Sequence, residues 1–170
     1  MRREKSYTGY LICSVICFLI FSISFLLMPI KSNEASQELS VVTLVAGLMF
    51  WIGLVIGIIT QIILSSIRKR WITKNKIKGR VENQPRLGLI SFFRNKAATF
   101  FDALLILSLL GLIISIATID ANDYMCYVFI ALLSFSFCTH CIFNGKNYFF
   151  IKNKDNIQKN IKKSKSNATV

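Results

Sequence analysis

Four apolar stretches, almost free of charge, alternate with polar segments along this chain of 170 residues. They cover residues 9–30, 41–67, 100–119 and 124–143. As a helix, each stretch is long enough to cover about 30 Å, the hydrocarbon thickness of a bilayer. A helix of a soluble bundle would carry polar residues on its outer face, whereas these stretches are apolar nearly all round. The pattern predicts an all-α fold, an integral membrane bundle of four transmembrane helices.

The first apolar stretch has a second interpretation as a signal peptide, because Arg2, Arg3 and Lys5 precede it. It is longer than the roughly 7–15 residues of a signal-peptide core, and no small-residue cleavage site follows it. We therefore expect it to remain in the protein as the first span.

The charges predict the orientation of the spans. The chain has 21 Lys and Arg against 8 Asp and Glu, a net charge of +13. The bases gather in the N-terminus (1–8), a loop (68–99) and the tail (144–170), whereas segments 31–40 and 120–123 contain Lys31 as their one base. Lys and Arg near span ends stay on the cytoplasmic side during insertion. We expect a plasma-membrane protein with both termini cytoplasmic and with 31–40 and 120–123 as extracytoplasmic loops.

The basic loop indicates what the protein contacts at the membrane surface. Each Lys or Arg near anionic lipid contributes about 1 kcal/mol of attraction. No nucleic-acid-binding motif accompanies the bases, so we expect no nucleic acid partner. The predicted headgroup contacts are Arg68, Lys69, Arg70, Lys74, Lys76, Lys78 and Arg80.

The second half of that loop follows Pro85 and Gly88 and has a different pattern. It predicts an amphipathic helix near 87–98, lying in the headgroup layer before the third span. Thr99 and Asp102 fit a capping box, which would give Asp102 a structural role at the start of that span rather than one in proton transport. The apolar side of this predicted helix contains Leu89, Ile90, Phe93 and Ala97.

The tail beyond Lys152 is rich in Lys and Asn and has few apolar residues, so we expect it to be disordered or loosely bound to the membrane. Its sequon, Asn167-Ala168-Thr169, would lie on the cytoplasmic side and stay unmodified.

Small residues recur on one face of three of the spans. In lipid, helices associate where small side chains permit close approach, with a few hydrogen bonds between helices. The spacings favour a compact left-handed bundle. The predicted packing residues are Thr43, Gly47, Gly53, Gly57 and Gln61 in the second span, Ser108, Gly111 and Ser115 in the third, and Ala131 and Ser134 in the fourth.

Cysteines near the cytoplasmic ends of two spans raise the question of a metal site. Cys138, His140 and Cys141, with Cys13 and Cys17 at a similar depth, have the ligand types that zinc takes. Buried free cysteine is more often a small apolar side chain, so we expect no metal and no cofactor. A quinone-linked thiol oxidase would need its CxxC cysteines at the oxidising side, which this orientation does not provide.

A second polar stripe in the fourth span joins Ser136, His140 and Asn144 at intervals of one helical turn. It either makes hydrogen bonds between helices or lines a conduction path, and the first interpretation is favoured. No catalytic arrangement of residues can be named from the sequence.

Two stretches carry a family resemblance, Gly88-Leu-Ile-Ser-Phe-Phe-Arg-Asn-Lys96 and His140-Cys-Ile-Phe-Asn-Gly-Lys-Asn-Tyr148. Together they resemble a group of small uncharacterised membrane proteins of Gram-positive bacteria. The resemblance covers roughly the second half of the chain and implies a bacterial plasma membrane, without implying an activity.

The sequence thus predicts a non-enzymatic accessory, immunity-like or regulatory component that acts through helix packing or by association with another membrane protein or with itself. A small oligomeric transporter or pore, using the glycine face of the second span, is the alternative.

Overall fold

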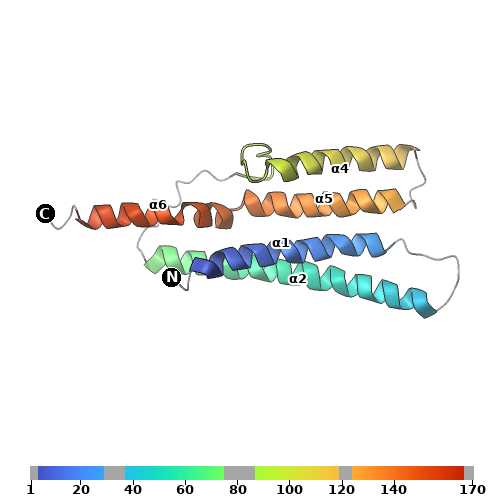
Figure 1. Ribbon diagram of the computed structural model, residues 1–170, viewed down its shortest axis with the longest axis horizontal. Coiled ribbons are helices and arrows are strands. Elements are labelled where there is room, and N and C mark those ends of the chain that lie inside the picture. The colour runs from blue at the N-terminus through green and yellow to red at the C-terminus, as the bar shows by residue number, and fades with distance from the viewer. Residues whose placement is uncertain (1–3, 29–36, 75–86, 119–123, 167–170) are drawn as a thin grey trace.

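The computed structural model describes residues 4–28, 37–74, 87–118 and 124–166, and within these ranges the chain forms helices and turns without a strand. Figure 1 shows the arrangement. The helices are α1 (Glu4–Leu27), α2 (Gln37–Lys74), α4 (Thr99–Thr118), α5 (Tyr124–Phe143) and α6 (Lys146–Ser166).

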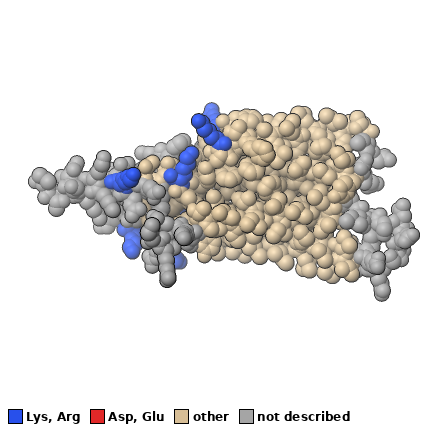
Figure 2. All heavy atoms as spheres, in the orientation of Figure 1, with Lys and Arg blue, Asp and Glu red and all other residues tan. Residues whose placement is uncertain are grey.

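Four of these helices are long and apolar enough to cross a membrane, over Tyr7–Leu27, Val41–Lys74, Thr99–Thr118 and Tyr124–Phe143. Their outer faces carry large apolar side chains, including Trp51 and Leu107, each 64% exposed. Such a continuous apolar surface is unusual for a soluble monomer. In Figure 2 the uncharged surface covers the body of the four helices, and the visible Lys and Arg side chains lie toward one end.

The four long helices lie in a row, in the spatial order α4, α5, α1, α2 (Figure 1). Within the described residues α4 packs against no helix other than α5. The prediction of a compact bundle, made from the small residues on one face of three spans, is therefore wrong. These faces bring neighbouring helices together, but they do not bring α4 against α2.

The pair α1–α2 is held by a close approach of backbones at Gly53. A Cβ atom added there would lie 2.6 Å from the Phe21 nitrogen and 2.7 Å from the Cys17 carbonyl oxygen. One turn later, Gly57 faces the ring of Phe18, and the Ser14 hydroxyl donates to the Gly57 carbonyl oxygen at 3.2 Å. The GxxxG pair of α2 is therefore the contact surface for α1.

The pair α4–α5 also packs closely at a glycine, Gly111. The ring of Phe129 occupies the space beside Gly111, and Ser115 makes a hydrogen bond with Cys126 at 3.2 Å. Ser108 and Ser115 are both buried, which places the small face of α4 against α5.

The tail forms α6, in place of the disorder that its composition predicted. Its first turns are held by Phe150, which is 1% exposed and makes edge-to-face ring contacts with Tyr7 and Trp71. Asn147 donates to the Gln61 side-chain oxygen at 3.0 Å and accepts from the Ser65 hydroxyl at 3.2 Å. These contacts attach the first turns of α6 to α1 and α2, so a helix can continue into the lysine-rich part.

Residues 87–98 form turns rather than the predicted amphipathic helix. The backbone of Phe93 adopts a left-handed conformation, with φ of 57°, which cannot continue a right-handed helix. Leu89, Ile90 and Phe93 are exposed in this segment, with Ile90 at 93%, and so are Arg94 and Lys96.

Candidate functional site: a buried Asp102–His140 pair

Two ionisable side chains meet where α4 begins and α5 ends. Asp102 lies in the first turn of α4 and His140 in the last turn of α5, and the two helices are antiparallel neighbours. The Nδ1 atom of His140 forms a hydrogen bond with Oδ1 of Asp102. The side chains are 1% and 0% exposed, so the pair lies out of contact with solvent.

The second carboxylate oxygen of Asp102 binds the preceding turn segment. The backbone N–H of Phe93 donates to Oδ2 at 2.7 Å. The predicted capping box does not form, because the two N–H groups that it would use donate elsewhere: that of Thr99 to the Asn95 carbonyl oxygen at 3.0 Å, and that of Asp102 to the Ala98 carbonyl oxygen at 2.8 Å. Asp102 thus connects three parts of the chain: α4, α5 and residues 87–98.

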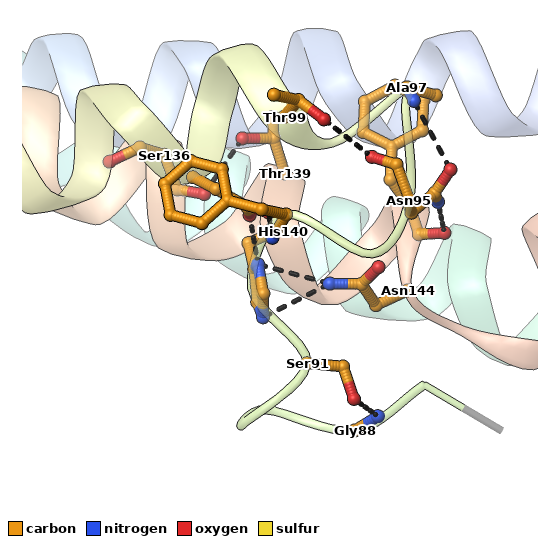
Figure 3. A network of polar contacts seen from close by, with 12 residues as sticks. Gly88, Ser91, Asn95, Ala97, Thr99, Ser136, Thr139, His140 and Asn144 are labelled. Carbon is orange, nitrogen blue, oxygen red and sulfur yellow. Dashed lines mark hydrogen bonds and ion pairs between the residues drawn. The ribbon is translucent and has the colours of Figure 1, made fainter.

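Asn144, one turn after His140, completes the polar cluster. Its amide nitrogen lies 3.1 Å from Nδ1 and 3.2 Å from Nε2 of the imidazole, as the dashed lines of Figure 3 show. Asn144 is 4% exposed, and its Oδ1 atom is buried without a hydrogen-bond partner among the described residues. A buried amide oxygen without a partner is uncommon, because the lost solvation is not replaced.

The turn segment covers the pair. The ring of Phe92 stacks on the imidazole of His140, with centroids 4.7 Å apart and planes 25° apart. Asn95, which is 4% exposed, donates from its amide to the Phe143 carbonyl oxygen at 2.7 Å. The segment is therefore fixed to both helices by side-chain contacts although it has no regular structure.

The hydroxyl groups beside the pair bond to their own helix. Ser136 donates to the Leu132 carbonyl oxygen at 2.6 Å, and Thr139 donates to the Phe135 carbonyl oxygen at 2.8 Å. Neither hydroxyl makes a hydrogen bond with His140. The arrangement therefore lacks the nucleophile-to-base hydrogen bond of a Ser-His-Asp triad.

The structure brings most of the predicted packing residues to helix interfaces, but not all of them. Gly53, Gly57, Ser108, Gly111 and Ser115 lie in the contacts described above, and Gln61 bonds to Asn147. Ser134 donates to the Ser22 hydroxyl at 3.1 Å, between α5 and α1, close to buried Ala131.

Two predicted packing residues of α2 lie elsewhere. Thr43 is exposed, and a Cβ atom added at Gly47 would meet nothing within 4 Å. The 100° periodicity placed them on the packing face, but the buried residue in this part of α2 is Ala46, which is 1% exposed, whereas Thr43 is exposed and Gly47 is only partly buried. Gly47 therefore lies beside open space.

The cysteines and His140 do not form a metal cluster. Across the described ranges, no three His, Cys, Asp or Glu side chains lie close enough to hold a metal ion. All five cysteines are free thiols, with Cys13 and Cys141 exposed and Cys17 buried. His140 uses its imidazole on Asp102 and Asn144, and Cys138 packs against the apolar core around Phe18.

The predicted headgroup contacts lie partly outside the described residues. Lys76, Lys78 and Arg80 fall in residues 75–86, which the structure does not describe. Lys69, Arg70 and Lys74 are exposed on the last turns of α2, so this helix continues beyond residue 67, where the predicted span ended, into the basic segment.

Sequence reasoning missed the partnership of Asp102 with His140. The signal was present: each is the one ionisable side chain near the end of a span, and antiparallel neighbouring spans bring those two ends to the same side. Comparison of the chain with protein-family models, with curated proteins and with solved structures finds no match.

Proposed function

We propose that this chain is a multi-pass plasma-membrane protein whose termini and basic loop face the cytoplasm, and that it acts as a non-enzymatic accessory, immunity-like or regulatory component. Two features of the described structure support this proposal. Four helices are apolar enough to span a bilayer, and the Lys and Arg side chains in view lie toward one end of the molecule (Figure 2).

The observation that carries the proposal is the open row of helices. α4 contacts α5 along one side and presents apolar side chains elsewhere, among them Leu107 at 64% and Ile114 at 60% exposure. The polar side chains Ser108 and Ser115 are turned inward against α5. An edge helix of this kind can pack against a helix of another membrane protein, or of a second copy, without disturbing the fold.

The chemistry around His140 supports a role without catalysis. Its polar neighbours hold the turn segment and the two helices together, and the adjacent hydroxyls are committed to carbonyl groups of α5. The alternative, a small oligomeric transporter or pore using the glycine face of α2, needs that face free, whereas α1 packs against it at Gly53 and Gly57 in the described structure.

We further propose that residues 87–98 lie at the inner membrane surface, although they form turns. Leu89, Ile90 and Phe93 are exposed beside the start of α4, and Arg94 and Lys96 are exposed in the same segment. Apolar side chains flanked by bases suit the boundary between anionic headgroups and acyl chains.

Site-specific photo-cross-linking in intact cells tests the association. A photoreactive phenylalanine analogue replaces Leu107 or Ile114 on α4, and the matched control places it at Ile23 of α1, a helix with a neighbour on each side. We expect a discrete protein adduct from the α4 positions and none from Ile23. Absence of protein adducts at both α4 positions would count against partner association through this edge.

A further inference from the structure

The second part of α6 stands away from the other helices. Near the start of α6, Phe150 lies in the apolar core around Phe18, and Ile151 packs against that core. Residues 152–166, called here the distal part of α6, continue the helix. In Figure 1 α6 runs on along the direction of α5, and its distal part extends past the ends of α1 and α2. Packing within the chain therefore explains the first turns of α6 and not the rest of the helix.

The distal part of α6 is strongly basic. It contains six Lys against one Asp. Lys152 and Lys159 are exposed, and neither forms an ion pair with another described side chain. The nearby last turns of α2 are basic as well, with Lys69, Arg70 and Lys74 exposed. A second copy of the chain would bring like charges together at this end, which is unfavourable, so the charge calls for a different, acidic partner.

The direction of α6 takes its last bases away from the bilayer that the four apolar helices are suited to cross. A helix rises about 1.5 Å per residue, which puts the backbone at Lys162 and Lys163 about 18–20 Å beyond Phe150 along the axis. The attraction of anionic headgroups falls off within a Debye length, about 8–10 Å. Because α6 runs along a spanning helix and not across it, lipid attracts its first turns and not its last ones.

One face of this basic helix is apolar. At 100° per residue, Phe150, Ile157 and Ile161 share a face, at intervals of seven and four residues. Ile157 is half-buried but does not belong to the described core that contains Phe150. Asn156, on another face, is exposed. Apolar residues four apart among lysines are typical of a basic helix that binds in the apolar groove of another protein.

We propose that the distal part of α6 docks into an apolar groove of an acidic cytoplasmic protein. Ile157 and Ile161 enter the groove, and the lysines face its acidic rim. The apolar face favours a protein over nucleic acid, because phosphates are neutralised by Lys and Arg and gain nothing from isoleucine. This inference rests on the proposed cytoplasmic placement of the tail, and it is independent of the proposed association through α4.

Binding to probes of known chemistry tests the proposal. The full chain, in phosphatidylcholine nanodiscs, is titrated with calcium-loaded calmodulin, an acidic protein with a Met-rich apolar groove, and separately with polyglutamate and with a polyuridylate RNA. We expect calmodulin to bind about tenfold or more tightly than either polymer, since the polymers offer no groove for an isoleucine. Equal or tighter binding of polyglutamate or of the RNA would overturn the proposal. Loss of calmodulin binding when phosphatidylglycerol replaces phosphatidylcholine would assign the helix to the bilayer instead.

A matched pair of variants separates the apolar face from charge alone. Ile157→Ser and Asn156→Ser both lie beyond the docked turns of α6 and leave its lysines in place. We expect Ile157→Ser to weaken calmodulin binding about tenfold, the effect of losing one buried isoleucine, and Asn156→Ser to change it little. Equal affinities of the two variants would contradict docking through the apolar face.

The placement of the tail is measured separately. An impermeant thiol reagent applied to intact cells carrying Ser164→Cys reports on which side of the membrane the distal part of α6 lies. Labelling there would refute the cytoplasmic placement, whereas equal binding of calmodulin by the Ile157→Ser and Asn156→Ser variants would refute the groove and leave the placement standing.

Discussion

Single side chains decide how closely the helices approach, and glycine positions show this most clearly. Gly53 and Gly47 lie on the same helix and differ in surroundings: one faces the backbone of α1, and the other faces open space. The sequence placed both in one packing face because a helical wheel assigns the same face to the whole helix, whereas the buried position beside Gly47 is Ala46.

A matched pair of alanine substitutions tests this difference. A methyl group at Gly53 would overlap backbone atoms of Phe21 and Cys17, so α1 and α2 must separate. We expect Gly53→Ala to lower the free energy of unfolding in mild detergent by about 1–3 kcal/mol. Gly47→Ala should be neutral or stabilise by up to about 1 kcal/mol, because alanine is the better helix former. Equal effects of the two changes would contradict the described α1–α2 contact.

The buried pair gives a second prediction at this scale. From sequence alone, replacing His140 with alanine is expected to change little, since no partner is assigned to it. The structure reverses that expectation: His140→Ala leaves Asp102 buried without the side chain to which it bonds, which lowers the free energy of unfolding by about 1–3 kcal/mol.

A double-mutant cycle measures the coupling. Because Asp102→Leu combined with His140→Leu removes both polar groups, the double variant should be more stable than either single variant. Additive losses, measured by denaturant titration in detergent, would show that the two side chains do not interact.

Among the elements, the four spanning helices were predictable from sequence and the segments at their ends were not. Long apolar runs fix the existence of the helices, since few alternatives satisfy the backbone in lipid. Residues 87–98 have a helical wheel pattern, but the contacts of Phe92 with His140 and of Phe93 with Asp102 hold them in turns. The start of α6 depends similarly on Phe150 and Asn147, whose partners lie on α1 and α2.

The docking of residues 87–98 can be tested by proteolysis. Asp102→Leu removes both carboxylate oxygens, so the Phe93 N–H group and the His140 ring each lose their partner on α4. We expect faster tryptic cleavage after Arg94 and Lys96, identified by mass. Cleavage after Arg70 and Lys74, which are exposed on α2, serves as the internal control and should be unchanged. Unaltered cleavage after Arg94 would contradict a docking role for Asp102.

For the whole molecule, the open row of helices and the distribution of Lys and Arg have different physical causes, the first in helix packing and the second in charge. Small residues bring helices together in pairs, as at Gly53 and Gly111. Within the described residues, α4 packs against α5 and against no other helix. Lys and Arg near span ends generally select the side on which a connecting segment remains, and the proposed orientation rests on this rule. Asp102 and His140 lie at the end of the α4–α5 pair that is next to residues 87–98, the last part of the basic loop.

The side on which each segment lies is the claim on which the proposed function rests, and impermeant thiol labelling tests it most directly. In a cysteine-free chain, single cysteines replace Asn33, Asn122 or Ser164, and intact cells are treated with a membrane-impermeant maleimide. Asn33 and Asn122 belong to interhelical segments outside the described residues. We expect labelling at positions 33 and 122, and labelling at 164 once the membrane is permeabilised. Labelling at 164 alone in intact cells would contradict it.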